Sequence, residues 1–239
     1  MEDPQKHQYY YSNAKYYLAA RKTYRLQNNW LEKNCKGKKV LVLGCGDGAE
    51  AFFLAKIGAE VVGIDISDVS IEKANKSVKA SGLSKKVGFL VMDAENLSFP
   101  DSSFDFVTAS GMLHHTDFKE TISEMARVLK PGGQAFCIEP LAYNPVFQLY
   151  RKLTPHLRTQ WEAEHILSKK ELKEASNYFG KIEKRFFHLF TLASVPFRNT
   201  LIFRPLLWIL ERIDGLVLKL PLIKWWAWQI VFILSKPKK

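Results

Sequence analysis

The chain has 239 residues, of which 47% are hydrophobic and 25% are charged, and its formal net charge is +11. This length suits one large domain, with or without an elaboration, and can bury a sizeable core. The three cysteines have neither the spacing of a metal site nor the even number of a disulfide framework, which excludes a disulfide-stapled scaffold and favours a reducing cytoplasm.

The positive charge is unevenly distributed along the chain. Residues 140–239 hold 17 Lys and Arg against 7 Asp and Glu, whereas residues 1–139 hold 18 against 17. An excess of this kind indicates an anionic partner, which could be nucleic acid, anionic lipid or an acidic substrate.

Residues 1–35 are predicted to form an N-terminal helical cap. Residues 4–33 have a helical composition rich in tyrosine, and the first residues lack the apolar core of a secretion signal. We expect most of these tyrosines to pack a helix onto the sheet with their hydroxyls in water. Tyr11 and Tyr17 are the two that we consider for contact with a cofactor.

A buried strand runs into a glycine loop at residues 40–48, which read VLVLGCGDG. Four apolar residues bounded by glycines are typical of a strand buried on both faces. Gly44, Gly46 and Gly48 carry no Cβ, so the backbone can turn sharply there and approach a ligand closely. Residues 49–56 have a helical composition, and strand, loop and helix together predict the opening unit of a nucleotide-binding α/β fold.

A second apolar strand at residues 60–65 ends in Asp65. A carboxylate at this strand end faces the same crevice and can accept hydrogen bonds from both hydroxyls of a ribose. The glycine spacing alone also fits a dinucleotide, so NAD is an alternative ligand.

The remaining elements of this half alternate between strand and helix. Strands are predicted at 39–43, 87–92, 104–109 and 134–139. Residues 67–81 predict a helix with Ser67 or Asp68 as the N-cap and Gly82 just after its end. The alternation indicates a parallel sheet with right-handed crossovers.

The order of these segments resembles the class I S-adenosylmethionine-dependent methyltransferases. Within them it is similar to the group that includes the ubiquinone and menaquinone C-methyltransferases and many natural-product O-methyltransferases. Four segments carry the resemblance together: GCGDG at 44–48, GIDIS at 63–67, MDAENLSFPDSSFDFV at 92–107 and RVLKPGG at 127–133. The resemblance implies a doubly wound, seven-stranded, mostly parallel sheet of the Rossmann-like methyltransferase type, with S-adenosyl-L-methionine as the cofactor.

The same resemblance implies the residues that hold the cofactor. Gly44, Gly46 and Gly48 would approach its amino-acid and ribose end, and Asp65 would bind the ribose hydroxyls. Around the adenine and the methionine portion it implies Ile66, Asp93, Ala94 and Ser110.

One position departs from the family pattern, because Val42 stands where an acid often precedes the glycine loop. The resemblance therefore leaves open how the methionine amino group is neutralised. Asp47 and Glu50 are the two candidates.

Three titratable residues are candidates for acid–base chemistry. Methyl transfer from a sulfonium is an in-line displacement, so the protein mainly holds the reactants in line and excludes water. His114 or His115, after the fourth strand, could deprotonate an acceptor hydroxyl, and Glu139, at the end of the fifth, could bind or deprotonate the acceptor. A structural role for the histidines is the alternative, and no Cys, His or Asp spacing indicates a metal.

After Glu139 the sequence becomes mixed polar and aromatic. Arg158 and His165 belong to a polar cluster that could bind an anionic or sugar-bearing substrate, or could lie in a solvated loop. Residues 168–178 predict a capped helix. Residues 182–190 and 228–235 predict two strands, and the resemblance implies that they pair as an antiparallel hairpin.

Residues 191–226 form an apolar and basic insertion between these two strands. Apolar residues recur at helical spacing, with Pro205 in the first turn of a helix and Gly215 as its stop. No stretch reaches the roughly 18 uncharged apolar residues that a spanning helix needs. The insertion could lie in a membrane interface, cover the substrate pocket as a lid, or form a dimer interface.

The sequence thus predicts a methyltransferase domain of residues 36–190 and 227–239 that acts on a small or lipid-like acceptor. Oxygen is the preferred acceptor atom, because histidines and a glutamate are expected to line the pocket. The alternatives are C-methylation of an isoprenoid quinone, methylation of RNA or protein, and a non-catalytic cofactor-binding scaffold. We expect a cytoplasmic protein that can associate with an anionic membrane surface, and nucleic acid is disfavoured because the aromatic residues of the basic segment lie among aliphatic ones.

Overall fold

The structure is a computed structural model, and it describes residues 16–154, 161 and 165–238. The chain divides into two compact units. The sheet unit comprises Leu26–Glu139, Lys169–Lys184 and Phe232–Lys239. The accessory unit comprises Met1–Arg25, Pro140–Ser168 and Arg185–Val231. The domain boundaries at residues 35, 190 and 227 stay predictions.

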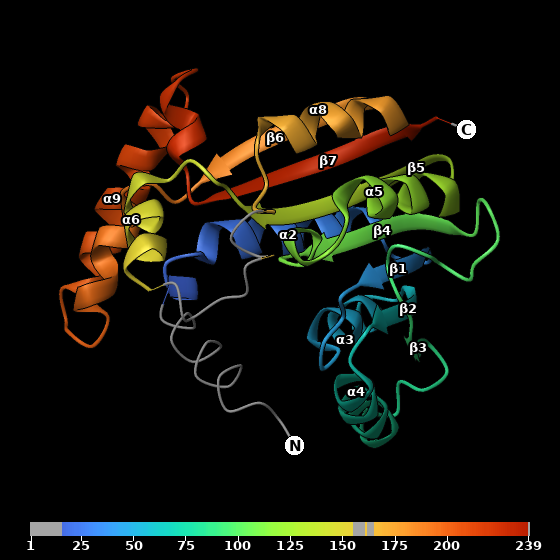
Figure 1. Ribbon diagram of the computed structural model, residues 1–239. Helices are drawn as coiled ribbons and strands as arrows, with labels where there is room; N and C mark the ends of the chain where they lie inside the picture. Colours follow the sequence, from blue (N-terminus) through green and yellow to red (C-terminus); the bar gives the residue numbers. More distant parts are fainter. Residues whose placement is uncertain (1–15, 155–160, 162–164, 239) are drawn as a thin grey trace. The chain divides into compact units, whose positions relative to one another are not determined.

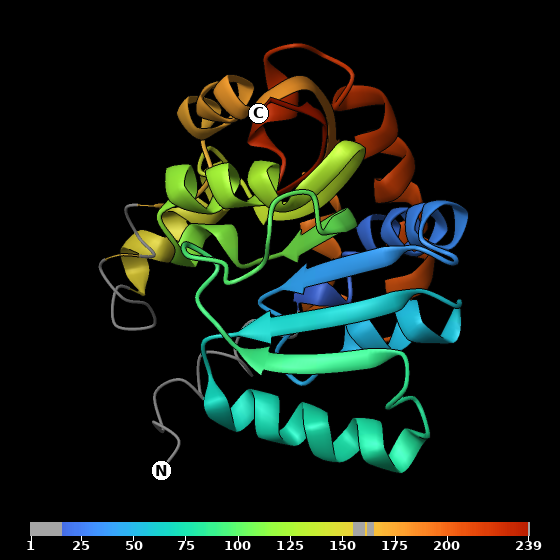
Figure 2. The same ribbon diagram turned by 90° about the vertical axis from the view of Figure 1, so that its right-hand side faces the viewer.

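A seven-stranded sheet has the order β3-β2-β1-β4-β5-β7-β6 (Figure 1). Four of its adjacent pairs are parallel, and the arrows of β1, β2 and β3 point the same way in Figure 2. The arrows of β6 and β7 point in opposite directions (Figure 1). The strands are β1 (Lys39–Leu43), β2 (Glu60–Asp65), β3 (Val87–Val91), β4 (Phe104–Ser110), β5 (Leu129–Pro140), β6 (Phe179–Phe187) and β7 (Gln229–Pro237).

This is the α/β, doubly wound, mostly parallel fold that the sequence predicts. β1 and β2 have the predicted bounds. β5 begins five residues earlier than expected, because Leu129 already pairs with Phe104 ahead of a register shift. β6 begins at Phe179 rather than at residue 182, and it ends at Phe187.

The sheet unit has helices packed on its strands. They are α2 (Arg21–Asn34, which begins in the accessory unit), α3 (Ala49–Lys56), α4 (Asp68–Ser81), α5 (Phe118–Val128) and α8 (Lys169–Tyr178), with a short 3₁₀ turn, η1 (Leu113–His115). Val40 and Val42 share one core cluster with side chains of α3 and α4, while Leu41 and Leu43 are also buried. Because successive side chains alternate between the faces of a strand, β1 is buried on both faces, as predicted.

The caps of α4 follow the sequence signals. The Ser67 side chain accepts a hydrogen bond of 3.2 Å from the Ser70 amide, which satisfies one free N–H of the first turn. Gly82 follows the helix with φ of 70°, a conformation that glycine adopts without steric cost. The predicted start and stop of this helix are confirmed.

The accessory unit contains α6 (Pro145–Leu153), η3 (Thr191–Phe197), α9 (Phe203–Val217) and η4 (Ile223–Trp226). α9 packs against η3. An aromatic cluster forms part of the core, in which the rings of Phe147 and Trp228 stack with their centroids 5.2 Å apart and Tyr16 meets both edge-on. The unit therefore has an apolar core of its own.

The predicted stop of the insertion helix at Gly215 is wrong. α9 continues through Gly215 to Val217, and Gly215 does not have the positive φ of a helix-ending glycine. Pro205 does lie in the first turn, as predicted. Among the described residues, no helix combines the length and the apolar character needed to cross a bilayer.

Candidate cofactor and methyl-transfer site

The glycine loop and the end of β2 are joined by a direct hydrogen bond. The Gly46 amide donates to Asp65 Oδ2 over 2.9 Å, and the Ser67 amide donates to Oδ1 over 2.9 Å. These bonds hold the carboxylate at the carboxyl end of the parallel strands, where ligands of open α/β sheets bind. Each oxygen keeps a further lone pair, so Asp65 can still accept hydrogen bonds from ribose hydroxyls.

The loop glycines serve two different purposes. A Cβ on Gly46 would meet no atom within 4 Å, so the backbone there faces open space that a ligand can enter. A Cβ on Gly44 would lie 2.8 Å from Met112 Cβ, so this glycine instead allows the loop after β4 to pack closely. Both have positive φ, 61° at Gly44 and 53° at Gly46.

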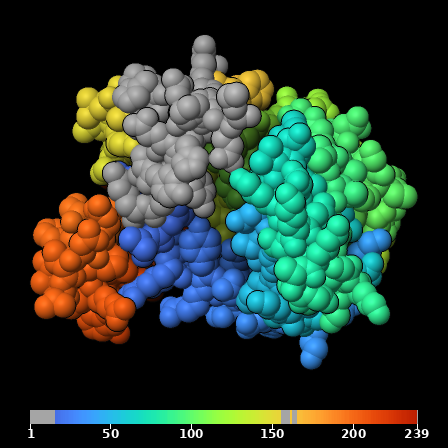
Figure 3. Space-filling view, turned by 90° about the horizontal axis from the view of Figure 1, so that it is seen from below, coloured from blue at the N-terminus to red at the C-terminus, as the bar shows by residue number. Residues whose placement is uncertain are grey.

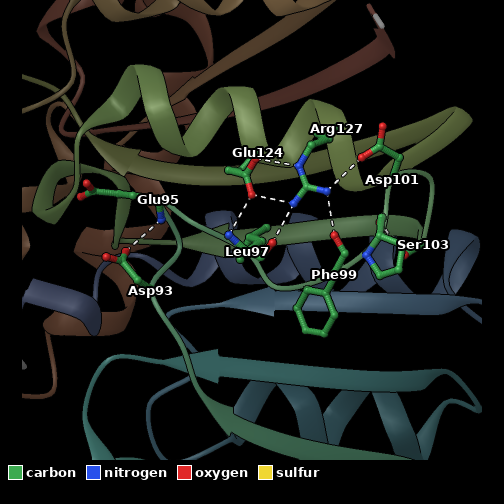
Figure 4. A network of polar contacts seen from close by, with 9 residues as sticks. Asp93, Glu95, Leu97, Phe99, Asp101, Ser103, Glu124 and Arg127 are labelled. Carbon is green, nitrogen blue, oxygen red and sulfur yellow. Dashed lines mark hydrogen bonds and ion pairs between the residues drawn. The ribbon is translucent and has the colours of Figure 1, made fainter.

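The segment after β3 carries Asp93 and Ala94, and Arg127 of α5 holds its continuation in place (Figure 4). Arg127 donates to the carbonyl oxygens of Leu97 and Phe99 over 2.7 Å each. It also pairs with both carboxylate oxygens of Glu124, at 2.7 Å each, and Glu124 Oε2 accepts the Leu97 amide over 2.7 Å. These hydrogen bonds hold in place a segment between β3 and β4 that has neither helix nor strand.

Within this segment the predicted adenine-binding residues have different environments. Asp93 is exposed, and its Oδ1 accepts the Glu95 amide over 2.9 Å, whereas Ala94 is buried. Ile66 is 77% exposed, although an apolar side chain gains by leaving water. The exposure of Ile66 and Asp93 suits residues that would flank a bound ring.

A second polar cluster links α2, α3 and the end of β4. The Gln27 amide nitrogen lies 2.7 Å from Glu50 Oε2 and 3.0 Å from Ser110 Oγ, and Ser110 donates to the same carboxylate oxygen over 3.2 Å. Glu50 Oε1 is inaccessible to solvent and has no hydrogen-bond partner among the described residues. Thr108, near Glu50, is paired in register with Val42, so the carboxylate lies beside the strand position where the family often has an acid.

Burial raises the pKa of Glu50, and the nearby Thr108, Ser110 and Gln27 side chains offset part of that rise. An unsatisfied carboxylate oxygen in such a place is unfavourable unless a donor or cation reaches it. Asp47, the other candidate, is exposed to water.

His114 and Glu139 form a directly bonded pair. The His114 Nδ1 atom lies 2.7 Å from Glu139 Oε2, and the amides of Met112 and Leu113 donate to Oε1 over 2.9 and 2.8 Å. The Glu139 side chain has no exposed surface, whereas His114 keeps 12% of its side chain exposed. An ionised carboxylate here selects the tautomer with the proton on Nδ1, which leaves Nε2 of His114 as an acceptor.

The other predicted site residues have separate surroundings. The His115 ring is exposed and lies 4.0 Å from that of His114, centroid to centroid. His165, in the accessory unit, stacks on Trp161 with centroids 3.7 Å apart. Tyr17 packs near Trp228 in the same unit. Arg158 and Tyr11 lie outside the described residues.

Sequence reasoning did not identify Gln27 or Arg127. Gln27 lies on the buried stripe of α2 with Thr23 and Leu31, at successive spacings of four residues, and polar side chains on such a stripe are a usable signal. Arg127 gave no such signal for this role, because the main-chain carbonyls that it bonds lie 28 and 30 positions away in sequence.

Comparisons with known proteins bear on the family and the fold of this chain. Residues 41–137, less than half of the chain, match the family model described as a methyltransferase domain. Methyltransferase GfsG of Streptomyces halstedii is 44% identical over 100 residues, which are 41% of this chain and 36% of that protein. Demethylmenaquinone methyltransferase of Geobacillus kaustophilus is 40% identical over 108 residues, which are 44% of this chain and 46% of that protein.

Solved structures extend the likeness beyond the matched segment. A structure from Methanosarcina mazei described as a SAM-dependent methyltransferase is 27% identical with a TM-score of 0.58, covering 84% of this chain and 93% of that one. The chain spans between about a quarter and a half of the length of the curated relatives that it matches. Residues 41–137 of this chain are therefore similar to a methyltransferase domain, and the chain has the class I methyltransferase fold.

Proposed function

We propose that this protein transfers the methyl group of S-adenosylmethionine to a small or lipid-like acceptor, with oxygen as the preferred acceptor atom. The observation that carries the proposal is the pairing of His114 with a fully buried Glu139 in the domain that also holds the glycine loop and Asp65.

The residues present fit the cofactor. The open backbone face at Gly46, flanked by Gly44 and Gly48, suits close approach of its amino-acid and ribose end. Asp65 would accept its ribose hydroxyls. Ile66, Asp93 and Ala94 would contact the adenine, and Ser110 would lie near the methionine portion.

We assign the neutralisation of the methionine amino group to Glu50 rather than to Asp47. Glu50 has an unsatisfied carboxylate oxygen, whereas Asp47 is exposed. Because Coulombic attraction is much stronger away from water, a buried carboxylate is the better partner for an ammonium group. Ser110 and Gln27 hold this carboxylate in one orientation.

In this proposal His114 and Glu139 have separate roles. When bound, the cofactor would supply an activated methyl group for in-line transfer to the acceptor oxygen, with the neutral thioether as the leaving group. His114 Nε2 accepts the proton of the acceptor hydroxyl, and Glu139 orients the ring and stabilises the imidazolium. Glu139 itself is a positioning residue, because three N–H groups occupy its oxygens. His115 is the second candidate for the base.

The acceptor class is proposed from the accessory part of the chain. The insertion at 191–226 is apolar and basic, which suits a lipid-like substrate, and Arg158 and His165 would bind a polar or anionic part of it. C-methylation of an isoprenoid quinone is the second candidate. It is favoured by the demethylmenaquinone methyltransferase that matches this domain, whereas the tocopherol O-methyltransferases that match it favour oxygen. We propose a cytoplasmic enzyme that works at a membrane surface, where such acceptors reside.

Transfer of labelled methyl from S-adenosylmethionine into lipid and small-molecule extracts tests the proposal. We expect one labelled product that requires the protein, and mass spectrometry gives its identity. Boron tribromide cleaves methyl ethers but not C-methyl bonds, so loss of the label supports oxygen and retention supports the quinone alternative. Absence of transfer with the full range of extracts would contradict the proposed activity.

A further inference from the structure

Helix α9 buries its acidic side chains and exposes large apolar ones, which is the reverse of an ordinary surface helix. Its buried positions include both of its acids, Glu211 and Asp214, which are 6% and 4% exposed. Its exposed positions include Trp208, Ile209, Ile213 and Leu216. These four recur at the spacing of one helix face, so the exposed stripe is continuous. Atoms of this segment, in orange and red-orange, reach the surface in Figure 3.

The buried acids are satisfied within the accessory unit. Asp214 accepts the amides of Leu189, Phe190 and Thr191, at 3.1, 2.7 and 3.3 Å. Glu211 forms a two-point pair with Arg21, at 2.6 and 3.0 Å. Both carboxylates therefore anchor the helix, which explains why its two acids face inward and leaves its apolar stripe outward.

The exposed charges of the insertion are all positive. Glu211 and Asp214 are its only acids, and both are buried. The basic side chains that reach solvent lie on and around α9: Arg198, Arg204, Arg212 and Lys219, with the partly exposed Lys224. The Arg212 guanidinium lies 4.1 Å from the centroid of the exposed Trp208 ring. Apolar side chains and cations are thus interleaved on one surface.

Exposed apolar side chains also flank the helix in sequence. Leu201 is 96% exposed just before α9, and Leu222 is 81% exposed after it. Large aliphatic side chains in water are costly, and contiguous exposed patches of them mark interaction sites. We define the α9 face as Leu201, Arg204, Trp208, Ile209, Arg212, Ile213, Leu216, Lys219 and Leu222.

We propose that the α9 face binds in the interfacial plane of an anionic lipid bilayer. Fifteen residues are too short to span the hydrocarbon core, so the helix would lie parallel to the surface. Its aliphatic side chains and Trp208 would enter the headgroup–acyl boundary while its cations meet lipid phosphates. This extends the proposed function by naming the partner surface, but membrane binding and methyl transfer can fail separately.

Charge complementarity distinguishes the bilayer from a second copy of the chain. A symmetric dimer through this face would bring arginines and lysines of both copies together, and the insertion exposes no acid to pair with them. An anionic bilayer supplies both the negative charge and the apolar layer that the face requires.

Vesicle flotation of the full-length protein tests the proposal. Vesicles of phosphatidylcholine and phosphatidylglycerol (7:3) should bind the protein, and pure phosphatidylcholine should bind it at least 10-fold more weakly. The variant Ile209→Ser/Leu216→Ser/Leu222→Ser should lower binding at least 10-fold, and so should Arg204→Glu/Arg212→Glu/Lys219→Glu. The control Lys79→Glu/Lys85→Glu/Lys86→Glu makes the same change of charge on exposed residues of the sheet unit and should bind within threefold of the wild type.

A second measurement tests insertion directly and is independent of stability. Brominated acyl chains should quench the tryptophan fluorescence of the wild type, and Trp208→Phe should lose a large part of that quenching. Circular dichroism and calorimetric binding of S-adenosylmethionine show whether each variant is folded and whether the cofactor site is intact. Vesicle binding therefore reports on the membrane proposal, and cofactor binding reports separately on the proposed function.

Three results would overturn the inference. One is a wild type that does not bind anionic vesicles, and another is binding that survives both triple substitutions in folded protein. The third is sedimentation showing that the α9 face forms a dimer, or binding of RNA through it, without association with vesicles.

Discussion

The Nδ1 atom of His114 lies 2.7 Å from Oε2 of Glu139, whose side chain is fully buried, while the histidine keeps 12% of its side chain exposed. The carboxylate is thus held inside the protein, whereas Nε2 is the ring nitrogen of His114 that this contact does not use. This asymmetry allows the two residues to be tested separately.

Replacing His114 should affect turnover without affecting the cofactor. His114→Ala is expected to lower the rate of methyl transfer to a hydroxyl acceptor by about 10²- to 10⁴-fold, the usual contribution of a general base. Calorimetric affinity for S-adenosylmethionine should stay within threefold. If the acceptor is a carbon nucleophile that needs no base, the rate will change little, which would count against the O-methylation proposal.

Glu139→Gln should have a larger effect on stability than His114→Ala. The amide places an N–H₂ group among three N–H donors, so at least one buried donor loses its partner. We expect a loss of about 1–3 kcal/mol in the free energy of unfolding, measured by urea denaturation. Equal effects of the two substitutions would show that the carboxylate does not organise the loop after β4.

Glu50→Gln should weaken the binding of S-adenosylmethionine and should abolish the release of protons that accompanies this binding. The pKa of Glu50 is raised by burial, and a bound ammonium group would lower it again. Binding should therefore release protons and strengthen as the pH rises, which calorimetry in buffers of different ionisation enthalpy measures. We expect about a 10- to 100-fold loss of affinity in Glu50→Gln.

The matched controls for Glu50 are Asp47→Asn, which tests the alternative acid, and Glu60→Gln, which changes an exposed carboxylate. Both should bind the cofactor like the wild type. A loss in Asp47→Asn with none in Glu50→Gln would reverse the assignment.

Arg127 should control the stability of the segment that carries the adenine-binding residues. Arg127→Met removes its bonds to the carbonyls of Leu97 and Phe99 and to Glu124 (Figure 4). The free energy of unfolding should fall by about 1–3 kcal/mol, and amides near Asp93 should exchange with deuterium faster. Lys85→Met, at an exposed position, is the control and should change neither measurement.

His188 should make the protein less stable in mild acid. Its Nε2 atom lies 2.7 Å from Thr23 Oγ1 in the accessory unit, and burial lowers its pKa from 6.5 to about 3. Below about pH 6.5 the unfolded chain takes up a proton that the folded protein does not, so stability is lost as the pH falls towards 3. Between pH 7.5 and 5 this residue should contribute a loss of about 2 kcal/mol in the free energy of unfolding.

His188→Asn separates this effect from that of other titrating groups. Asparagine tolerates the positive φ of 67° at this position and keeps a donor and an acceptor, but it does not titrate. The slope of stability against pH should be shallower in this variant. Identical slopes in variant and wild type would show that His188 is not the group responsible.

The sheet could be predicted from sequence because its signals are local. An apolar run of strand length, glycines at the strand end, Ser67 as a cap and Gly82 as a stop each act within a few residues. The prediction at Gly215 was wrong because a glycine can lie inside a helix when other contacts outweigh its conformational cost. Glu211 and Asp214 anchor α9 in the turn that precedes Gly215.

The site was only partly predictable, for a different reason. Asp65 lies at a strand end, so topology alone brings it to the glycine loop. The pairs Gln27–Glu50 and His114–Glu139 join residues 23 and 25 positions apart, and which nitrogen faces which oxygen depends on packing that no short pattern encodes. The burial of the acids of α9 likewise depends on partners that the sequence does not reveal, in α2 and in the loop before η3.

Calorimetric titration of the protein with S-adenosylmethionine, and separately with NAD, is the most direct test of the account. We predict saturable binding of S-adenosylmethionine, no binding of NAD, and an affinity for S-adenosylmethionine about 10- to 100-fold weaker in Asp65→Ala, because that carboxylate would lose charge-assisted hydrogen bonds to the ribose. Binding of NAD in its place, or an unchanged affinity in folded Asp65→Ala, would contradict it.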